Sequence, residues 1–203
     1  HLDVEQFKQT EVGRTFLELM NQPEIARKLD ALKAIFNFDI RTDLDGLTAC
    51  GAGRRSAVIA RGRFDQQRLL TLLRGGDGYE ELVLDGRTIH SWIDEGKAKK
   101  QGADKARMYG AIHRSGAAVL SEQADTVAHV LKVLDGEAES LPAAALTPEY
   151  PAVLTARMSA EALPQKATDH PVARQLLSAA GIIGQHGTNV EARLELTLKD
   201  AEA

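Results

Sequence analysis

The sequence of 203 residues contains one cysteine, Cys50, and only 4% of its residues are aromatic. A single cysteine excludes an internal disulfide, which fits the cytoplasm and equally fits an exported bacterial protein without disulfides. With so few aromatic residues, a core must be built mainly from Leu, Ile, Val and Ala. No apolar run approaches the roughly 20 residues that a membrane-spanning helix needs.

The sequence also has little that points to nucleic acid, metal or cofactor chemistry. Its 25 Lys and Arg and 29 Asp and Glu give a formal net charge of -4, with the two signs interspersed. No extended basic field is available to hold a phosphate backbone, so we expect no nucleic acid partner. The 6 His are isolated and form no metal-ligand pattern. Phosphate-loop, G-x-S-x-G and S-x-x-K patterns are missing, so we assign no catalytic residue, metal or cofactor.

The N-terminal segment has the periodicity of two helices, which we expect to pack as a hairpin with a buried seam. Asp3 is placed to cap the first helix, with Gln6 as its capping-box partner. Asn21-Gln22-Pro23 ends this helix and begins the next one, with Pro23 at its first position. Apolar residues at the seam are Val4, Phe7, Phe16, Leu17 and Met20 in the first helix, and Ile25, Leu29, Leu32 and Phe36 in the second.

After this hairpin, the period changes to the alternation typical of strands. "LTACGAG" and "SAVIARG" predict two strands joined at 51–53, followed by a helix, "QQRLLTLLR", capped by Asp65. Asp85-Gly86 lies between two alternating runs and predicts a tight hairpin, because both turn positions need a positive φ. A second hairpin is predicted around 114–116, and Ser121 is expected to cap a helix that ends at Gly136.

Two stretches of this region have similar patterns. "VIARGRFDQQRLLTLLRG" and "VLSEQADTVAHVLKVLDG" both predict a strand, a polar cap, an amphipathic helix and a terminal Gly. The echo indicates an internal duplication of one strand–helix unit.

The remaining segments complete the predicted organisation. Residues 139–151 are Pro-rich and predict a linker. The next predicted elements are a strand at 152–158, a short helix stopped near Pro164 and a helix at 171–180. After them come strands at 182–186 and 189–198. We therefore expect an α+β protein with a mostly antiparallel sheet that helices cover on one face. Its parts are residues 1–138, the linker 139–151 and a second, incomplete unit at 152–203, whose last residues resemble the start of a further helix.

The best candidate for a ligand-binding site lies on two of the predicted strands. His90 and Trp92 share one face of "RTIHSWID", and Tyr109 and His113 share one face of "ARMYGAIH". If the strands pair with these faces aligned, the four side chains form a polar and aromatic patch. The patch is either a ligand surface or a cross-strand ladder that stabilises a solvated sheet face.

The motifs "RGRFDQQRLLTLL" and "DGRTIHSW", followed by a helix that ends in "VLDG", resemble a group of bacterial proteins built of strand–helix units that have no assigned activity. The resemblance covers most of residues 1–140. It implies export to the periplasm or the cell exterior, and the start at His1 is compatible with a removed signal peptide. It assigns no catalytic residue.

Two functions follow as hypotheses. The first is a non-enzymatic, exported module that binds a protein partner or associates with itself. The second is a small-molecule binding protein or enzyme that uses the patch of His90, Trp92, Tyr109 and His113, which requires a concave site with perturbed titratable groups.

Overall fold

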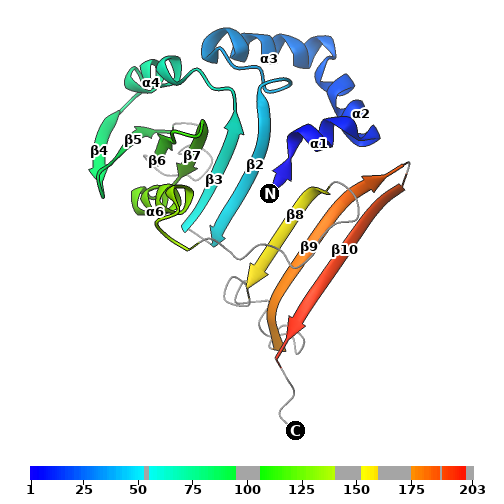
Figure 1. Ribbon diagram of the computed structural model, residues 1–203. Helices are drawn as coiled ribbons and strands as arrows, with labels where there is room; N and C mark the ends of the chain where they lie inside the picture. The colour runs from blue at the N-terminus through cyan, green and yellow to red at the C-terminus, as the bar shows by residue number, and fades with distance from the viewer. Residues whose placement is uncertain (53–54, 95–105, 140–151, 160–174, 188, 200–203) are drawn as a thin grey trace. The chain divides into compact units, whose positions relative to one another are not determined.

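The computed structural model describes residues 1–52, 55–94, 106–139, 152–159, 175–187 and 189–199 (Figure 1). Helices and antiparallel strands confirm the α+β class. The chain divides into a central unit, residues 16–141, and a terminal unit, residues 1–15 and 142–203. Residues 1–15 therefore group with the C-terminal strands. The sequence analysis had instead placed them in the first unit, residues 1–138. The expected linker lies almost entirely outside the described residues.

The central unit contains a sheet of six strands in the spatial order β2-β3-β7-β6-β5-β4, and every neighbouring pair is antiparallel. The strands are β2 (Leu44–Ala52), β3 (Arg55–Gly62), β4 (Glu80–Leu84), β5 (Arg87–Ile93), β6 (Arg107–Ile112) and β7 (Ala117–Ser121). Asp85 and Gly86 have φ values of 50° and 73°, which confirms the predicted tight hairpin. The hairpin around 114–116 is confirmed as well, with Gly116 at a φ of 81°.

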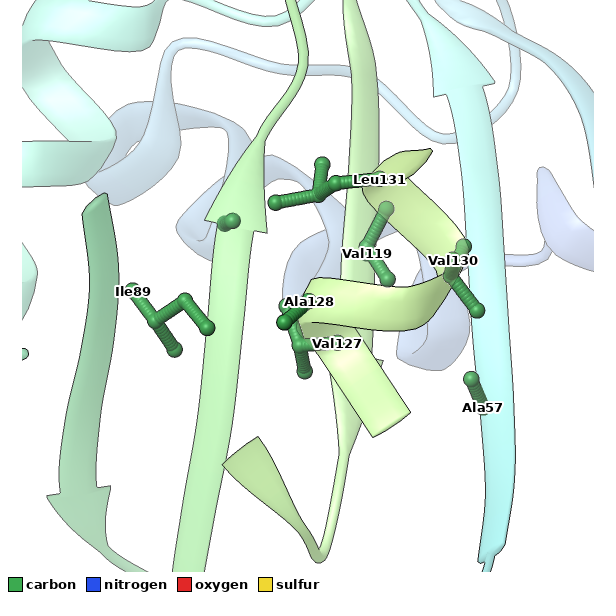
Figure 2. Close-up of a cluster of buried hydrophobic side chains, with 8 residues drawn as sticks. Ala57, Ile89, Val119, Val127, Ala128, Val130 and Leu131 are labelled. Atoms are coloured by element: carbon green, nitrogen blue, oxygen red, sulfur yellow. The ribbon is translucent and has the colours of Figure 1, made fainter. Parts of the chain in front are cut away.

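Helix α6 (Ala124–Asp135) covers one face of this sheet, as Figure 2 shows. The core between them consists of Ala57, Ile89, Ala111, Val119, Val127, Ala128, Val130 and Leu131. The expectation of a sheet covered on one face is confirmed for this unit. The expected cap is wrong, because Ser121 is the last residue of β7 and its hydroxyl donates to the carbonyl of Ser56 at 2.8 Å. The helix instead begins after Gln123, which provides no side-chain cap.

The other described helices are α1 (Val4–Gln9), α2 (Glu11–Met20), α3 (Pro23–Phe36) and α4 (Gln66–Arg74). The caps at Asp3 and Asp65 are confirmed, since their carboxylates accept from the backbone N–H groups of Gln6 at 2.9 Å and Arg68 at 3.0 Å. The first predicted helix is in fact two helices, because the chain breaks at Thr10. Gly13 permits this break, since a Cβ at Gly13 would lie 1.8 Å from the Phe7 carbonyl oxygen.

Neither the helical seam nor the duplication is confirmed. Phe16 and Leu32 remain nearly half exposed, and α3 buries no residue. The two helices of the sequence echo also differ in packing. Helix α6 buries four residues against the sheet, whereas α4 buries none and contacts α3.

The terminal unit contains four antiparallel strands in the order β10-β9-β8-β1, which we call the terminal sheet. Its strands are β1 (Leu2–Asp3), β8 (Ala152–Ser159), β9 (Leu176–His186) and β10 (Asn189–Leu198). The predicted strands at 152–158 and 189–198 are confirmed. The helix predicted at 171–180 is wrong over its described part, because β9 begins at Leu176 and pairs with a strand on each side. The helix predicted near Pro164 lies outside the described residues.

Candidate functional site

The register between β5 and β6 separates the four residues of the predicted patch. Ser91 lies directly opposite Tyr109, and directly opposite residues share a face of the sheet. Tyr109 therefore points with Ser91 toward the face that α6 covers, and His113 continues this alternation. His90 and Trp92 point to the other face, as expected. The expectation of one combined patch is wrong. It required His90 or Trp92 to lie directly opposite Tyr109, whereas the observed register is shifted by one residue and places Ser91 there.

His90 is 7% exposed and belongs to a small polar group of the central unit. Its Nδ1 lies 2.9 Å from the hydroxyl of Tyr79, and the two rings stack with centroids 5.9 Å apart. The carboxylate of Glu81 lies 3.9 Å from Nδ1 and 3.8 Å from the guanidinium of Arg74. Burial lowers the pKa of His90; the Glu81 charge opposes this shift and the Arg74 charge adds to it. The surroundings of His90 therefore favour its neutral form.

This lowered pKa predicts a pH-dependent stability. Below the unfolded His pKa of about 6.5, the unfolded chain takes up a proton that the folded state resists, so the free energy of unfolding falls as the pH drops from about 7.5 toward the folded pKa. We expect the variant His90→Gln to lose part of this decrease. Urea denaturation over this pH range measures it, with His129→Gln on the exposed side of α6 as the matched control. A pH slope in His90→Gln equal to that of the control contradicts the assignment.

His113 lies in a second polar group, at the C-terminal end of α6. Its Nδ1 lies 2.7 Å from the Ser115 hydroxyl and its Nε2 lies 3.1 Å from a carboxylate oxygen of Asp135. The connectivity is that of a serine–histidine–aspartate relay, but Asp135 is also bound by Arg87 at 2.9 Å and by Arg114 at 2.9 Å. The negative charge of Asp135 is therefore shared with two guanidinium groups. In a catalytic relay, the aspartate instead stabilises mainly the imidazole of the histidine. The group ties the β6–β7 turn to the end of α6.

The two aromatic candidates lie on opposite faces of the sheet. Tyr109 packs against the buried core beneath α6. Trp92 lies over Gly110, where its Cη2 atom is 3.1 Å from the position that a Cβ would occupy. Gly110 thus leaves room for the Trp92 ring on the uncovered face of β6. The single cysteine, Cys50, is half-buried in β2, and burial raises the pKa of its thiol.

The terminal unit carries an apolar sheet face that the sequence analysis did not identify. Along β10, apolar and charged residues alternate, and Val190, Leu194 and Leu196 are 61%, 68% and 48% exposed. Their neighbours on the same face of β9 and β8 are also apolar and more than a third exposed: Leu177, Ile183 and Leu154. A contiguous exposed apolar patch of this kind marks an interaction site more often than a lone exposed Leu does.

A hollow of about 230 Å³ lies at the centre of this face. The side chains around it are large at the rim, from Leu154, Ile183 and Leu194, whereas Ala156 and Gly181 are small. Register explains this arrangement, since Gly181 lies opposite Ala156 on one side and Leu194 on the other. A Cβ added at Gly181 would be 3.8 Å from its nearest neighbour, so the glycine keeps the hollow open without being required by the backbone.

Other kinds of site find no support in the part of the chain that the structure describes. No group of three or more His, Cys, Asp or Glu side chains there converges as a metal site. No helix among the described residues is long and apolar enough to cross a membrane. Comparisons of the chain with protein-family models, curated proteins and solved structures gave no match.

Proposed function

We propose that this protein is a non-enzymatic interaction module, and that it binds a protein partner through the apolar face of the terminal sheet. The partner places a large apolar side chain, such as Leu or Phe, in the hollow at Gly181. The observation that carries the proposal is this hollow, ringed by exposed Leu and Ile side chains on an otherwise apolar face. Export from a bacterial cell, which the sequence resemblance implies, belongs to the same proposal.

The size of the hollow favours a protein side chain over a small-molecule ligand. Sites for small ligands have volumes of about 300–1,000 Å³ and add a few convergent polar groups to an apolar lining. The hollow is smaller, at about 230 Å³, and Arg193 is the only polar residue among those that line it. Protein interfaces, by contrast, concentrate their binding energy in a few large anchors that fill pockets of this kind.

The two polar groups of the central unit support the same choice. His90 has its Nδ1 beside the Tyr79 hydroxyl, and His113 has both ring nitrogens in contact with its own neighbours. These contacts within the fold explain why both histidines are buried, without a ligand. The small-molecule alternative relied on a joint patch of four residues, and the register divides that patch between two faces.

The variant Gly181→Leu is expected to abolish binding in the hollow while leaving the sheet folded, because the new side chain fits the space and fills it. The probe is N-acetyl-phenylalaninamide, followed through the backbone amide signals of Ala156, Gly181 and Ala192 by NMR. Wild type should show saturable shifts with a dissociation constant on the order of millimolar, as expected for so small a ligand. The matched control is Ala180→Leu, one residue along β9, which changes the opposite face.

Two results would count against the proposal. In one, wild-type protein shows no saturable shift at the hollow. In the other, Gly181→Leu binds the probe as tightly as Ala180→Leu does. A folded state of both variants is checked by the dispersion of the remaining amide signals.

A further inference from the structure

We propose that β10 pairs edge to edge with β10 of a second copy of this chain, in an antiparallel register centred on Leu194. This goes beyond the proposed function, because it concerns the edge of the terminal sheet, whereas the hollow lies on its face. The pairing places the apolar faces of two copies side by side in one continuous sheet.

The edge itself is the first observation. Among the described strands, β10 pairs only with β9, and it forms the outer edge of the terminal sheet (Figure 1). All ten of its residues are exposed. A long edge strand offers a row of backbone N–H and C=O groups to another strand, and proteins commonly protect such edges with Pro, bulges or inward-pointing charges. β10 contains no Pro, and its only irregularity lies near its end, between Thr197 and Leu198.

The alternation along β10 limits the possible registers. Opposite residues share a face, so apolar positions must oppose apolar positions, or the charges of one copy enter the apolar face of the other. In an antiparallel two-fold pairing, this condition requires a residue at the centre rather than a peptide bond between two residues. Near the middle of the strand, the candidates are therefore pairings centred on Ala192, Arg193, Leu194 or Glu195.

Charge complementarity removes two of these four. A centre at Arg193 places this cation opposite itself, and a centre at Glu195 places that anion opposite itself; like charges directly opposite destabilise a sheet. A centre at Ala192 places Arg193 opposite Glu191 but brings only Ala192 against Ala192 on the apolar face. A centre at Leu194 brings the larger Leu194 against Leu194, which buries more apolar surface. It also places Arg193 of each copy opposite Glu195 of the other. The two-fold axis makes this contact twice, as an isologous interface requires.

The same centre keeps the backbone pairing within the regular part of β10. It pairs residues 191–197 of one copy with 197–191 of the other. This stretch ends where the regular pairing of β10 ends, between Thr197 and Leu198. On the apolar face, Leu194 meets Leu194 and Ala192 meets Leu196. The strand is thus complementary to its own copy in charge, in apolar pattern and in length.

The test uses the full chain and measures its mass in solution by sedimentation equilibrium over a range of protein concentrations. Wild type is expected to reach twice the mass of a 22.0 kDa chain. Arg193→Glu places two like-charge pairs in the interface, so the dimer dissociation constant should rise by about tenfold. The double variant Arg193→Glu with Glu195→Arg exchanges the charges, restores both pairs and should return the dissociation constant to near the wild-type value. Lys28→Glu on the exposed side of α3 controls for net charge.

Three outcomes overturn the pairing: a single-chain mass for wild type at every concentration, equal dimerisation of Arg193→Glu and Lys28→Glu, or no recovery in the double variant. The probe titration at Gly181 is repeated on the single-chain form. If the mass stays that of one copy while the hollow still binds the probe, the pairing fails and the proposed function stands. If the dimer forms but the hollow does not bind the probe, the proposed function fails and the pairing stands.

Discussion

Ile89→Ala is expected to lower the free energy of unfolding of the central unit by about 3 kcal/mol, within the range of about 2–5 kcal/mol for buried Ile-to-Ala changes. Ile89 is 0% exposed and packs beneath α6, in the cluster of Figure 2. The loss has two parts: the transfer free energy of the deleted methyl and methylene groups, and the cavity that the surrounding sheet and helix leave unfilled. Trp92, the only tryptophan, lies on the same strand and reports the unfolding of this unit by fluorescence.

The matched control is Val83→Ala on the neighbouring strand β4. Val83 is 67% exposed, so its truncation leaves no cavity and should change the free energy of unfolding by less than about 0.5 kcal/mol. Because the chain has two units, fluorescence is compared with the circular dichroism signal of the whole protein. Equal losses in both variants would show that α6 does not cover Ile89 in solution.

Asp135→Asn is expected to lower the urea midpoint of the central unit clearly at about pH 7, where Asp135 is ionised. The substitution removes the negative charge that His113, Arg87 and Arg114 share at the end of α6. It thereby removes the carboxylate partner of Arg114 and leaves Arg87 with Glu137, at 2.8 Å, as its remaining counter-charge. The control is Asp125→Asn, an exposed carboxylate in the first turn of the same helix.

The pH dependence of this effect has a definite sign. The hydrogen bond from His113, and then that from Arg87, hold the pKa of Asp135 below its usual value. Its contribution to stability is therefore complete above the unfolded pKa of about 3.9 and is lost as the pH falls through the lower folded pKa. The gap between wild type and Asp135→Asn should narrow in acid. A gap that is the same at about pH 7 and about pH 3 would argue that the carboxylate acts by packing alone.

Sequence patterns predict most of the central unit because its signals are local. The Asp85-Gly86 turn needs two positive φ values, and few other residue pairs accept them. The cap at Asp65 follows from a hydrogen bond that spans three residues, and the same local signal predicts the cap at Asp3 in the terminal unit. Ile89 alternates with His90 along β5 and is fully buried on the face that α6 covers.

The errors occur where distant pairing decides the structure. Alternation assigns the faces of each strand separately but does not set the register of β5 on β6, so the faces of His90 and Tyr109 were aligned wrongly. The segment at 176–180 is rich in Ala, which favours a helix locally. Its hydrogen bonds to β8 and β10 along both sides outweigh that preference, and its small side chains suit the middle of the sheet.

The candidate site was missed for a related reason. The alternation in "NVEARLELTL" predicts a strand with one apolar face, and the ordinary expectation is that such a face is buried. Leu194 and Val190 are instead exposed. The hollow depends on Gly181, Ala156 and Leu194 meeting from three strands, which no single stretch of sequence indicates.

The measurement that tests the central claim most directly is the probe titration of the whole chain, with amide signals of both units followed together. If the terminal sheet is the binding surface, N-acetyl-phenylalaninamide shifts the amide signals of positions 181 and 192 saturably in wild type. The amide signals of the same two positions do not shift in Gly181→Leu. Saturable shifts at Trp92 and Leu120 on the central sheet, with none at Gly181, would contradict the account and return attention to the His90 face.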